Sequence, residues 1–238
     1  MAHAPVVMAD DVALQAAARA ALDLVPDGAR VGLGSGRAAA TFITLLGERA
    51  RAGLRVAGVP TSAASARQAR ELGIPLVDLD EDVELDCTID GADEVAPNLD
   101  LVKGWGGALV PERIVASASR RQIILVEPAK LVGRLGERGR IPVEVIPLAR
   151  GPVARRLRAL GFVPTVRSDD AGRPLPTESG HLTLDAAPRA PLANAAAARE
   201  LEAALRAIPG VVDTGLFLGT AERVIVGHPD GQVETLRR

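Results

Sequence analysis

Two kinds of apolar segment alternate along the first half of the chain. Short runs such as residues 30–34 and 122–126 are apolar at nearly every position, which is typical of strands buried on both faces of a parallel sheet. Between these runs, alanine and leucine recur at the spacing of one helix face. We therefore expect a parallel sheet with helices on both of its faces. The expected helices cover residues 11–24, 37–51, 62–72 and 108–119, and the expected strands cover residues 30–34, 54–59, 76–79, 85–89, 99–102 and 122–126.

The pattern changes near residue 136, where Gly136-Glu-Arg-Gly-Arg-Ile-Pro142 resembles a linker. The following strands and helices predict a small α+β domain over residues 136–208, closed by the break at Pro209-Gly210. Two later strands are expected to return to the first domain, which then comprises residues 1–135 and 209–238. The expected strands of this second half are residues 143–146, 163–167, 182–184, 211–217 and 223–226, and its expected helices are residues 153–160 and 193–207.

Composition narrows the class of protein. Of the 238 residues, 47% are hydrophobic but only 2% are aromatic, so the core must consist of Ala, Val, Leu and Ile. The net charge is −2 and there is no basic block, which argues against nucleic acid as a partner. No apolar run reaches the ~18 residues of a membrane span, and the N-terminus lacks the pattern of a signal peptide. The single cysteine, Cys87, excludes an intramolecular disulfide and a thiolate zinc site. We therefore expect a soluble, cytoplasmic enzyme or binding protein.

The chain has only two lysines, Lys103 and Lys130, against 26 arginines. An ammonium is a compact charge on a flexible stem, whereas a guanidinium is a flat fork, so two retained lysines suggest positions where the fork does not serve. The alternative is that codon bias removed most lysines and left two at random. Lys103 favours the first interpretation, because it lies in residues 86–112, the stretch of the chain richest in glycine and polar residues.

A glycine-rich segment, Gly32-Leu-Gly-Ser-Gly-Arg-Ala38, joins a predicted strand to a predicted helix. Glycines allow a tight turn, and the free N–H groups at the start of the helix attract an anion. The spacing matches neither a dinucleotide-binding fingerprint nor a P-loop. We therefore expect a simple phosphate monoester at this segment, with Arg37 at the helix start adding a cation. The structural alternative is a turn that only packs the helix against the strand.

Two carboxylates, Asp90 and Asp93, follow the predicted strand at residues 85–89. In open α/β sheets, ligands bind beyond the carboxyl ends of the strands. Like charges that are held close raise the pKa of one of them, which suits proton transfer. One alternative is that Asp90 only caps a turn. Another is a magnesium site, although a nearby lysine would compete with the cation; its ligands would be Asp90, Asp93, Glu94 and Asp100.

The third candidate segment, Lys103-Gly-Trp-Gly-Gly107, comes just before a predicted helix. Lys103 can stabilise an oxyanion, and Glu112, about one turn into the helix, can act as a general base. The alternative for Glu112 is an acidic residue that the helix dipole stabilises in a first turn. Trp105, the only tryptophan, is either a wall of the site or an exposed loop residue.

The remaining candidates carry weaker signals. Lys130 follows the strand at residues 122–126 and is either a ligand of a phosphate or hydroxyl group or a solvated surface lysine. Ser35 has no histidine partner near any motif, so acyl-transfer chemistry is not expected. The three histidines match no triad or metal spacing; they are His3, His181 and His228.

Seven motifs occur in order along the chain. They are Val31-Gly-Leu-Gly-Ser-Gly36, Val59-Pro-Thr-Ser62, Asp90-Gly-Ala-Asp-Glu94, Lys103-Gly-Trp-Gly-Gly-Ala-Leu109, Lys130-Leu-Val132, Pro142-Val-Glu-Val-Ile-Pro147 and Pro209-Gly-Val-Val-Asp-Thr-Gly-Leu-Phe217. Together they resemble the type A ribose-5-phosphate isomerase family, from about residue 10 to the C-terminus. The resemblance implies an α/β fold with a Rossmann-like parallel-sheet domain and a second, smaller α+β ferredoxin-like domain, in homodimers or homotetramers. It also implies interconversion of ribose 5-phosphate and ribulose 5-phosphate in the non-oxidative pentose phosphate pathway, without a metal or organic cofactor.

The resemblance also implies residue roles. Glu112 resembles the proton-transferring base, and Lys103 the cation that stabilises the enediolate. Asp90 and Asp93 resemble the carboxylates that hold sugar hydroxyls and pass protons between oxygens. The implied substrate-binding residues are Ser35, Gly36, Arg37, Ala38, Asp90, Gly91, Ala92, Asp93, Lys103, Gly104, Trp105, Gly106 and Lys130.

The chain departs from the family pattern in three ways. Arg37 and Ala38 replace two hydroxyl residues of the phosphate loop, and a charge-assisted contact from Arg37 is the expected compensation. Trp105 stands where the family usually has glycine. A lysine seen near the N-terminus of some members is missing, since the nearby positions are Leu14 and Gln15.

Two other functions remain as alternatives. A sugar-phosphate sensor would bind without turnover, but the chain has no evident helix-turn-helix segment and retains both Lys103 and Glu112. An amino-sugar phosphate deaminase would share a related fold. A nicotinamide dehydrogenase is disfavoured by the spacing of the glycine-rich segment.

Overall fold

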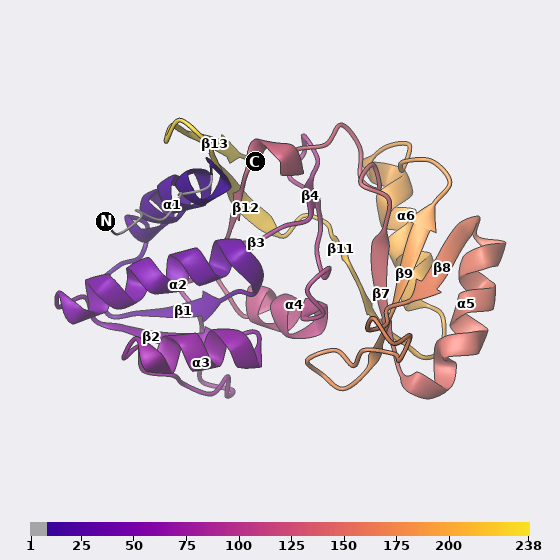
Figure 1. The fold of residues 1–238 in the computed structure, drawn as a ribbon, viewed down its shortest axis with the longest axis horizontal. Coiled ribbons are helices and arrows are strands. Elements are labelled where there is room, and N and C mark those ends of the chain that lie inside the picture. The colour runs from indigo at the N-terminus through magenta and orange to yellow at the C-terminus, as the bar shows by residue number, and fades with distance from the viewer. Residues whose placement is uncertain (1–8) are drawn as a thin grey trace, which may run out of the picture.

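The computed structural model describes residues 9–238, so His3 and the N-terminal segment tested for a signal peptide lie outside it. Its larger sheet has six strands in the order β13-β12-β6-β3-β1-β2 (Figure 1). All neighbours pair in parallel except β12 and β13, which confirms the predicted parallel sheet. The strands are β1 (Ala29–Leu33), β2 (Val56–Pro60), β3 (Cys87–Gly91), β6 (Gln122–Val126), β12 (Ala221–Gly227) and β13 (Val233–Arg237).

Alternate residues of the central strand β6 face two different cores, which explains its continuous apolar run. Ile123 and Leu125 belong to a cluster with α1 (Ala9–Leu22) and α2 (Gly36–Arg51). Helix α3 (Ala63–Glu71) packs beside α2. On the opposite face of the sheet, Ile124 and Val126 belong to a second cluster. A three-stranded antiparallel sheet and α4 (Leu109–Ser117) cover it; the three strands are β4 (Glu94–Val95), β5 (Leu101–Val102) and β11 (Leu216–Phe217).

Two details of this domain differ from the sequence prediction. The expected strand at residues 76–79 is wrong, because only Leu76 forms a bridge, to Gly58 of β2. The chain then continues as a loop whose apolar side chains, including Val77 and Leu79, pack against the sheet without joining it. Strand β13 was not predicted, because it is an exposed edge strand with few apolar residues. No helix within residues 9–238 has both the length and the apolar character needed to cross a membrane.

The smaller unit is a four-stranded antiparallel sheet with two helices on one face, at the right of Figure 1. Its strands follow the order β10-β7-β9-β8, and the chain runs β-α-β-β-α-β, which is the ferredoxin-like arrangement. The elements are β7 (Ile141–Val145), α5 (Arg150–Ala159), β8 (Phe162–Val166), β9 (Leu182–Pro188), α6 (Ala195–Arg206) and β10 (Val211–Thr214). Short 3₁₀ turns, η1 (Pro128–Lys130) and η2 (Pro147–Ala149), lie before and after β7.

The expectation that residues 211–217 form one strand returning to the first domain is wrong. Residues 211–214 pair with β7 in the small sheet, and only residues 216–217 pair with β5. The break is at Gly215, where an added Cβ would lie 2.4 Å from the carbonyl oxygen of Lys103. A glycine inside a predicted strand often marks such a close approach of two backbones. The division into residues 1–135 plus 209–238 and residues 136–208 stays a prediction.

Candidate active site

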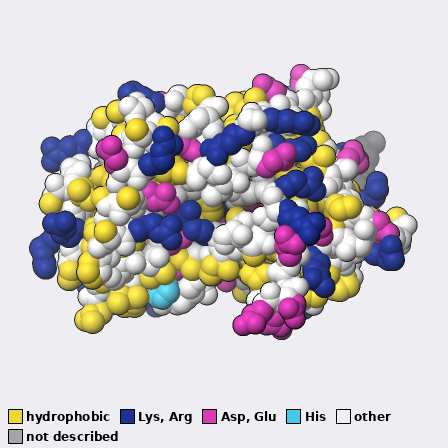
Figure 2. Space-filling view, turned by 180° about the vertical axis from the view of Figure 1, so that it is seen from behind, with side chains coloured by type: hydrophobic (Ala, Val, Ile, Leu, Met, Phe, Trp, Pro, Cys, Tyr) yellow, Lys and Arg dark blue, Asp and Glu magenta, His cyan; other side chains and the backbone are white. Residues whose placement is uncertain are grey.

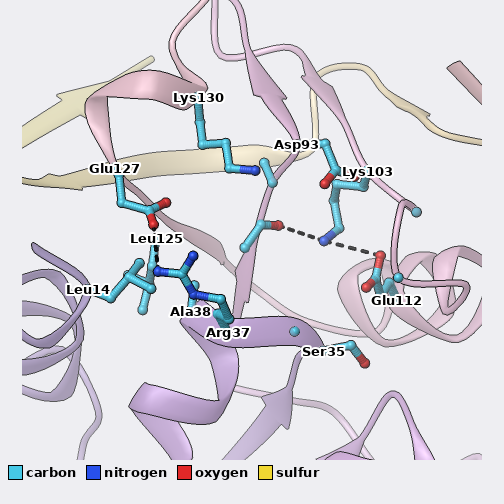
Figure 3. Close-up of a pocket in the computed structure, with 15 residues that line it drawn as sticks. Leu14, Ser35, Arg37, Ala38, Asp93, Lys103, Glu112, Leu125, Glu127 and Lys130 are labelled. Carbon is cyan, nitrogen blue, oxygen red and sulfur yellow. Dashed lines mark hydrogen bonds and ion pairs between the residues drawn. The ribbon is translucent and has the colours of Figure 1, made fainter. Parts of the chain in front are cut away.

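The carboxyl ends of β1, β3 and β6 surround a cavity of about 190 Å³, together with the start of α4. This is the position expected for a ligand in an open α/β sheet. Figure 3 shows Lys103 and Glu112 facing each other at one side of the cavity, and Arg37 and Glu127 at the other. The lining residues are Leu14, Ser35, Gly36, Arg37, Ala38, Gly91, Ala92, Asp93, Lys103, Gly104, Gly106, Glu112, Leu125, Glu127 and Lys130.

The glycine-rich turn after β1 lies directly against Asp90. An added Cβ at Gly34 would be 2.2 Å from Asp90 Oδ1, so only glycine allows this approach. Ser35 is the N-cap residue of α2, and its hydroxyl bonds with Thr61 rather than capping the helix. Gly36 has a φ of 82°. The first amides of a helix have no partner within the helix, so the cavity receives the anion-attracting end of α2.

Asp90 lies beneath the cavity and is fully buried. Its Oδ1 accepts hydrogen bonds from the backbone N–H groups of Ser35, at 3.1 Å, and of Gly91, at 2.7 Å. Its Oδ2 lies 2.8 Å from Nζ of Lys103. Asp90 therefore links the glycine-rich turn after β1 to the ammonium group of Lys103.

Lys103 is the centre of the buried charges, with only 2% of its surface exposed. Besides Asp90, its Nζ lies 3.2 Å from Glu112 Oε2 and donates a hydrogen bond of 2.7 Å to the carbonyl oxygen of Gly91. Burial alone would lower the pKa of Lys103, but the charges of Asp90 and Glu112 outweigh it and the pKa is raised. Lys103 therefore stays an ammonium.

Glu112 lies in the first turn of α4 and is 4% exposed. Burial raises the pKa of its carboxyl group to about 8; Lys103 opposes this shift, and the nearby charge of Asp90 adds to it. A carboxyl group with a pKa near neutrality can both accept and return a proton, which is the requirement for a general base that also acts as an acid.

Asp93 faces the cavity from the segment after β3. Its Oδ2 accepts a 3.0 Å hydrogen bond from the backbone N–H of Trp105. Burial raises the pKa of Asp93, while this hydrogen bond and Lys103 lower it. The cavity thus holds a second carboxyl group with a shifted pKa beside the Lys103 and Glu112 pair.

The other side of the cavity carries two further cations and one acid. Arg37 Nη2 lies 3.3 Å from Glu127 Oε1, and the Arg37 side chain is 63% exposed. Lys130 extends from η1 into the cavity and lies 5.7 Å from the ring of Trp105 (Figure 3). Arg37 and Lys130 therefore supply the positive charge on this side of the cavity, whereas Lys103 lies with Asp90 and Glu112 at the other side.

Most of the predicted substrate-binding residues line the cavity, but Asp90 and Trp105 do not. Asp90 lies underneath, and the Trp105 ring lies against arginine side chains of the neighbouring loop instead. Three residues that were not predicted to bind substrate also line the cavity: Leu14, which was noted only as lying near the missing lysine of the family, Leu125 and Glu127. Glu127 had a usable signal, since it directly follows the apolar strand β6, where the side chains of a site are expected.

The alternative prediction of a magnesium site is not supported, because Glu94 and Asp100 point into separate parts of the structure. Glu94 accepts hydrogen bonds from the backbone N–H groups of Gly136 and Arg138, at 2.5 and 2.6 Å. Asp100 accepts from Gly219 and Arg238 on another side of the molecule. Within residues 9–238, no group of three or more His, Cys, Asp or Glu side chains is placed to hold a metal ion.

The arrangement suits proton transfer at carbon next to a developing oxyanion. A carboxyl group of raised pKa supplies the base, and a buried ammonium faces it. The helix start and the two outer cations suit a phosphate group. Figure 2 shows that basic and acidic side chains are interspersed on that face of the molecule, so no basic patch stands out there among residues 9–238 as an alternative site for an anion.

A family model described as ribose 5-phosphate isomerase A (phosphoriboisomerase A) matches residues 57–231. A protein of that name from Gloeobacter violaceus is 50% identical over 227 residues, covering 95% of this chain and 96% of the relative. Another from Roseiflexus sp. is 45% identical over 229 residues, covering 95% and 97%. Among solved structures, ribose 5-phosphate isomerase A of Methanocaldococcus jannaschii is 41% identical with a TM-score of 0.88, covering 96% of this chain and 99% of the other. A D-ribose-5-phosphate isomerase in complex with phospho-erythronic acid is 36% identical with a TM-score of 0.91, covering 97% and 100%.

Proposed function

The chain belongs to the ribose 5-phosphate isomerase A family, and we propose on this premise that it interconverts D-ribose 5-phosphate and D-ribulose 5-phosphate. The observation that carries the mechanism is the buried contact of 3.2 Å between Lys103 and Glu112 at the wall of the cavity. A solved relative bound to phospho-erythronic acid, an acyclic phosphorylated sugar acid, supports an open-chain sugar phosphate as the ligand.

Glu112 removes the proton on C2 of the open-chain aldose. The electron pair of that C–H bond forms the C1–C2 double bond, and the carbonyl electrons move to O1, which gives a cis-enediolate. Glu112 then returns the proton to C1, while the proton on O2 moves to O1. The product has a ketone at C2 and a hydroxyl at C1, so no external oxidant or reductant is needed.

Lys103 stabilises the negative charge that develops on oxygen. Its ammonium is buried, so the interaction is screened less than it would be in water. Asp93, which lines the cavity, passes the proton between the two oxygens. Asp90 lies below the cavity and acts by holding Lys103 and the backbone of Ser35 in place.

The phosphate group binds at the start of α2. Ser35, Gly36, Arg37 and Ala38 line that end of the cavity, and Lys130 lines it from η1. The backbone amides of the helix start supply donors, and the two cations offset the charge of the phosphate. From the family we further propose a cytoplasmic homodimer or homotetramer that works without a cofactor.

The decisive experiment is a coupled isomerase assay with ribose 5-phosphate in the presence of a chelator. We expect turnover, and we expect Glu112→Gln to lower kcat by ~10²–10⁴, since its amide cannot accept the proton. Glu48→Gln, an exposed change on α2, is the matched control and should retain full activity.

Two results would replace this proposal with another function. Binding of ribose 5-phosphate without turnover by the wild type would identify a sensor. Release of ammonia from glucosamine 6-phosphate would identify a deaminase. A Glu112→Gln variant with wild-type kcat would leave the reaction in place but remove Glu112 as its base.

A further inference from the structure

One arginine of the small domain binds the backbone of the loop that carries Lys103. Arg167 follows β8, and its Nη1 donates hydrogen bonds to the carbonyl oxygens of Gly104, at 2.8 Å, and Trp105, at 2.9 Å. Its Nε and Nη2 donate to the two carboxylate oxygens of Asp185 on β9, at 3.0 and 2.5 Å. The Arg167 side chain is only 14% exposed. A guanidinium is the side-chain group that can bind a carboxylate with one edge and a backbone turn with another.

A second arginine holds the same loop through its tryptophan. The guanidinium of Arg140 lies 4.3 Å from the centre of the Trp105 ring. The backbone carbonyl oxygen of Arg140 also accepts a 3.4 Å hydrogen bond from Trp105 Nε1. Arg140 Nη1 also lies 3.5 Å from Asp185 Oδ2. Asp185 therefore orients two arginines, one on the backbone of the loop and one on its ring.

The loop needs support from outside because its own sequence is flexible. Three of the residues from 103 to 107 are glycines, and Gly104 and Gly107 have φ values of 99° and 85°. The loop also positions the chemistry. The N–H of Trp105 donates to Asp93, and Lys103, at the base of the loop, supplies the ammonium beside Glu112.

We propose that Arg167, oriented by Asp185, is a positioning residue that holds the loop of residues 103–107 in the geometry needed for isomerisation. The inference rests on the proposed function for its kinetic part. On this proposal the small domain contributes to the site. Lys103 and Glu112 come from the large domain, whereas Arg167 supports the loop that carries Lys103 from the face of the small sheet opposite its helices. A displacement of about 1 Å at a reacting group can cost as much as ~10²-fold in rate.

The test compares Arg167→Ala and Arg167→Lys with the wild type and with Arg173→Ala. Arg173 is the matched control, because its side chain is 81% exposed and pairs with Asp169 within its own turn. Trp105 is the only tryptophan, and the chain has no tyrosine, so intrinsic fluorescence reports on the loop alone.

We expect both Arg167 variants to lower kcat by about tenfold or more. KM should change less than about threefold, because Arg37 and Lys130, the proposed phosphate-binding cations, are unchanged. The Trp105 emission should shift to the red and be quenched more readily by acrylamide, while the Arg173 control keeps wild-type values. Methylguanidinium, but not methylammonium, should restore part of the kcat of Arg167→Ala, since only the former reproduces the fork.

Wild-type kcat in both variants would overturn the proposal, and so would a loss of kcat with an unchanged Trp105 emission. If Arg167→Ala does not fold, the Arg167→Lys variant decides by the same two measurements. Failure of the wild type itself to isomerise ribose 5-phosphate would reject the proposed function instead, while the fluorescence comparison would still test the support of the loop.

Discussion

Lys103 and Glu112 form a contact of 3.2 Å although both side chains are almost completely buried. Their neighbour Asp90 adds a second carboxylate to the same ammonium. The cluster therefore holds two carboxyl groups and one ammonium. Burial raises the pKa of Glu112 to about 8; the charge of Lys103 opposes this shift, and the charge of Asp90 adds to it. In the proposed mechanism, the cation that stabilises the oxyanion thus also opposes the rise in the pKa of the base.

The raised pKa of Glu112 predicts how activity depends on pH. The proton acceptor is the carboxylate, so kcat/KM for ribose 5-phosphate should rise with pH through about 8 and level off above it. Below that value, kcat/KM should fall by about tenfold for each pH unit, because the acid form of Glu112 cannot accept the C2 proton. A profile measured at constant ionic strength from about pH 6 to about pH 10 checks this. A flat profile below the apparent pKa would contradict it.

Replacing Lys103 by methionine should destabilise the fold as well as abolish activity. The change leaves Asp90 and Glu112 buried without their cation, and removing one partner of a buried ion pair typically costs about 3–5 kcal/mol. Adding Asp90→Asn to Lys103→Met should recover part of the lost free energy of unfolding, because it removes the carboxylate that lies 2.8 Å from the Lys103 ammonium and would otherwise be buried without a cation. Urea unfolding of the single and double variants measures both effects.

The matched control for this change is Lys130→Met, which removes the other lysine from a less buried position. Its free energy of unfolding should change by less than about 1 kcal/mol, as for most partly exposed substitutions. Equal stability of the Lys103 and Lys130 variants would show that the buried contacts of Lys103 are not what stabilises this part of the fold.

The pair of Arg37 and Glu127 predicts opposite effects on substrate affinity. Arg37→Ala should raise KM by about tenfold with little change in kcat, since a charge-assisted hydrogen bond contributes ~1.5–3 kcal/mol. Glu127→Gln should lower KM, because it removes a carboxylate that lies 3.3 Å from Arg37 and competes with the phosphate. Steady-state kinetics measure both, with Arg49→Ala, at the exposed end of α2, as control. An unchanged KM in Arg37→Ala would place the phosphate elsewhere.

Local signals in the sequence were sufficient to predict the parallel sheet and to select Lys103 as a candidate site residue, but not to predict that Lys103 is buried. The run of β6 is apolar on both faces, and Lys103 stands out because the chain otherwise uses arginine. The loop after Leu76 and the return of β10 to β7 were mispredicted, because both depend on which partner a short apolar segment meets in three dimensions.

The parts of the site that sequence reasoning missed are of the same kind. Leu14 and Leu125 are ordinary core residues by pattern, and only the packing of α1 against β6 brings them to the cavity wall. The contact of Arg167 with the loop at Gly104 joins residues 63 positions apart, so no local motif could indicate it. Glu127, by contrast, could have been predicted, because it directly follows β6 and binding sites lie at the carboxyl ends of such strands.

Gly34→Ala should reduce both stability and activity through Asp90. Gly34 does not need a positive φ, so the effect comes from space alone: the added Cβ would lie 2.2 Å from Asp90 Oδ1 and 2.3 Å from its Cγ. Asp90 would have to move, which would disturb its hydrogen bond from Ser35 and its contact with Lys103. We expect a loss of about 1–3 kcal/mol in the free energy of unfolding and about 10²-fold in kcat.

Gly151→Ala is the control for that experiment, because it adds the same methyl group within helix α5, where nothing lies within 4 Å of the new Cβ. It should leave kcat unchanged and stabilise the protein by about 0.5–1 kcal/mol through helix propensity. Urea unfolding and the coupled assay, applied to both variants, separate the two outcomes. A Gly34→Ala protein with wild-type stability and kcat would mean that Asp90 is free to shift, and that its hold on Lys103 is not needed for the reaction.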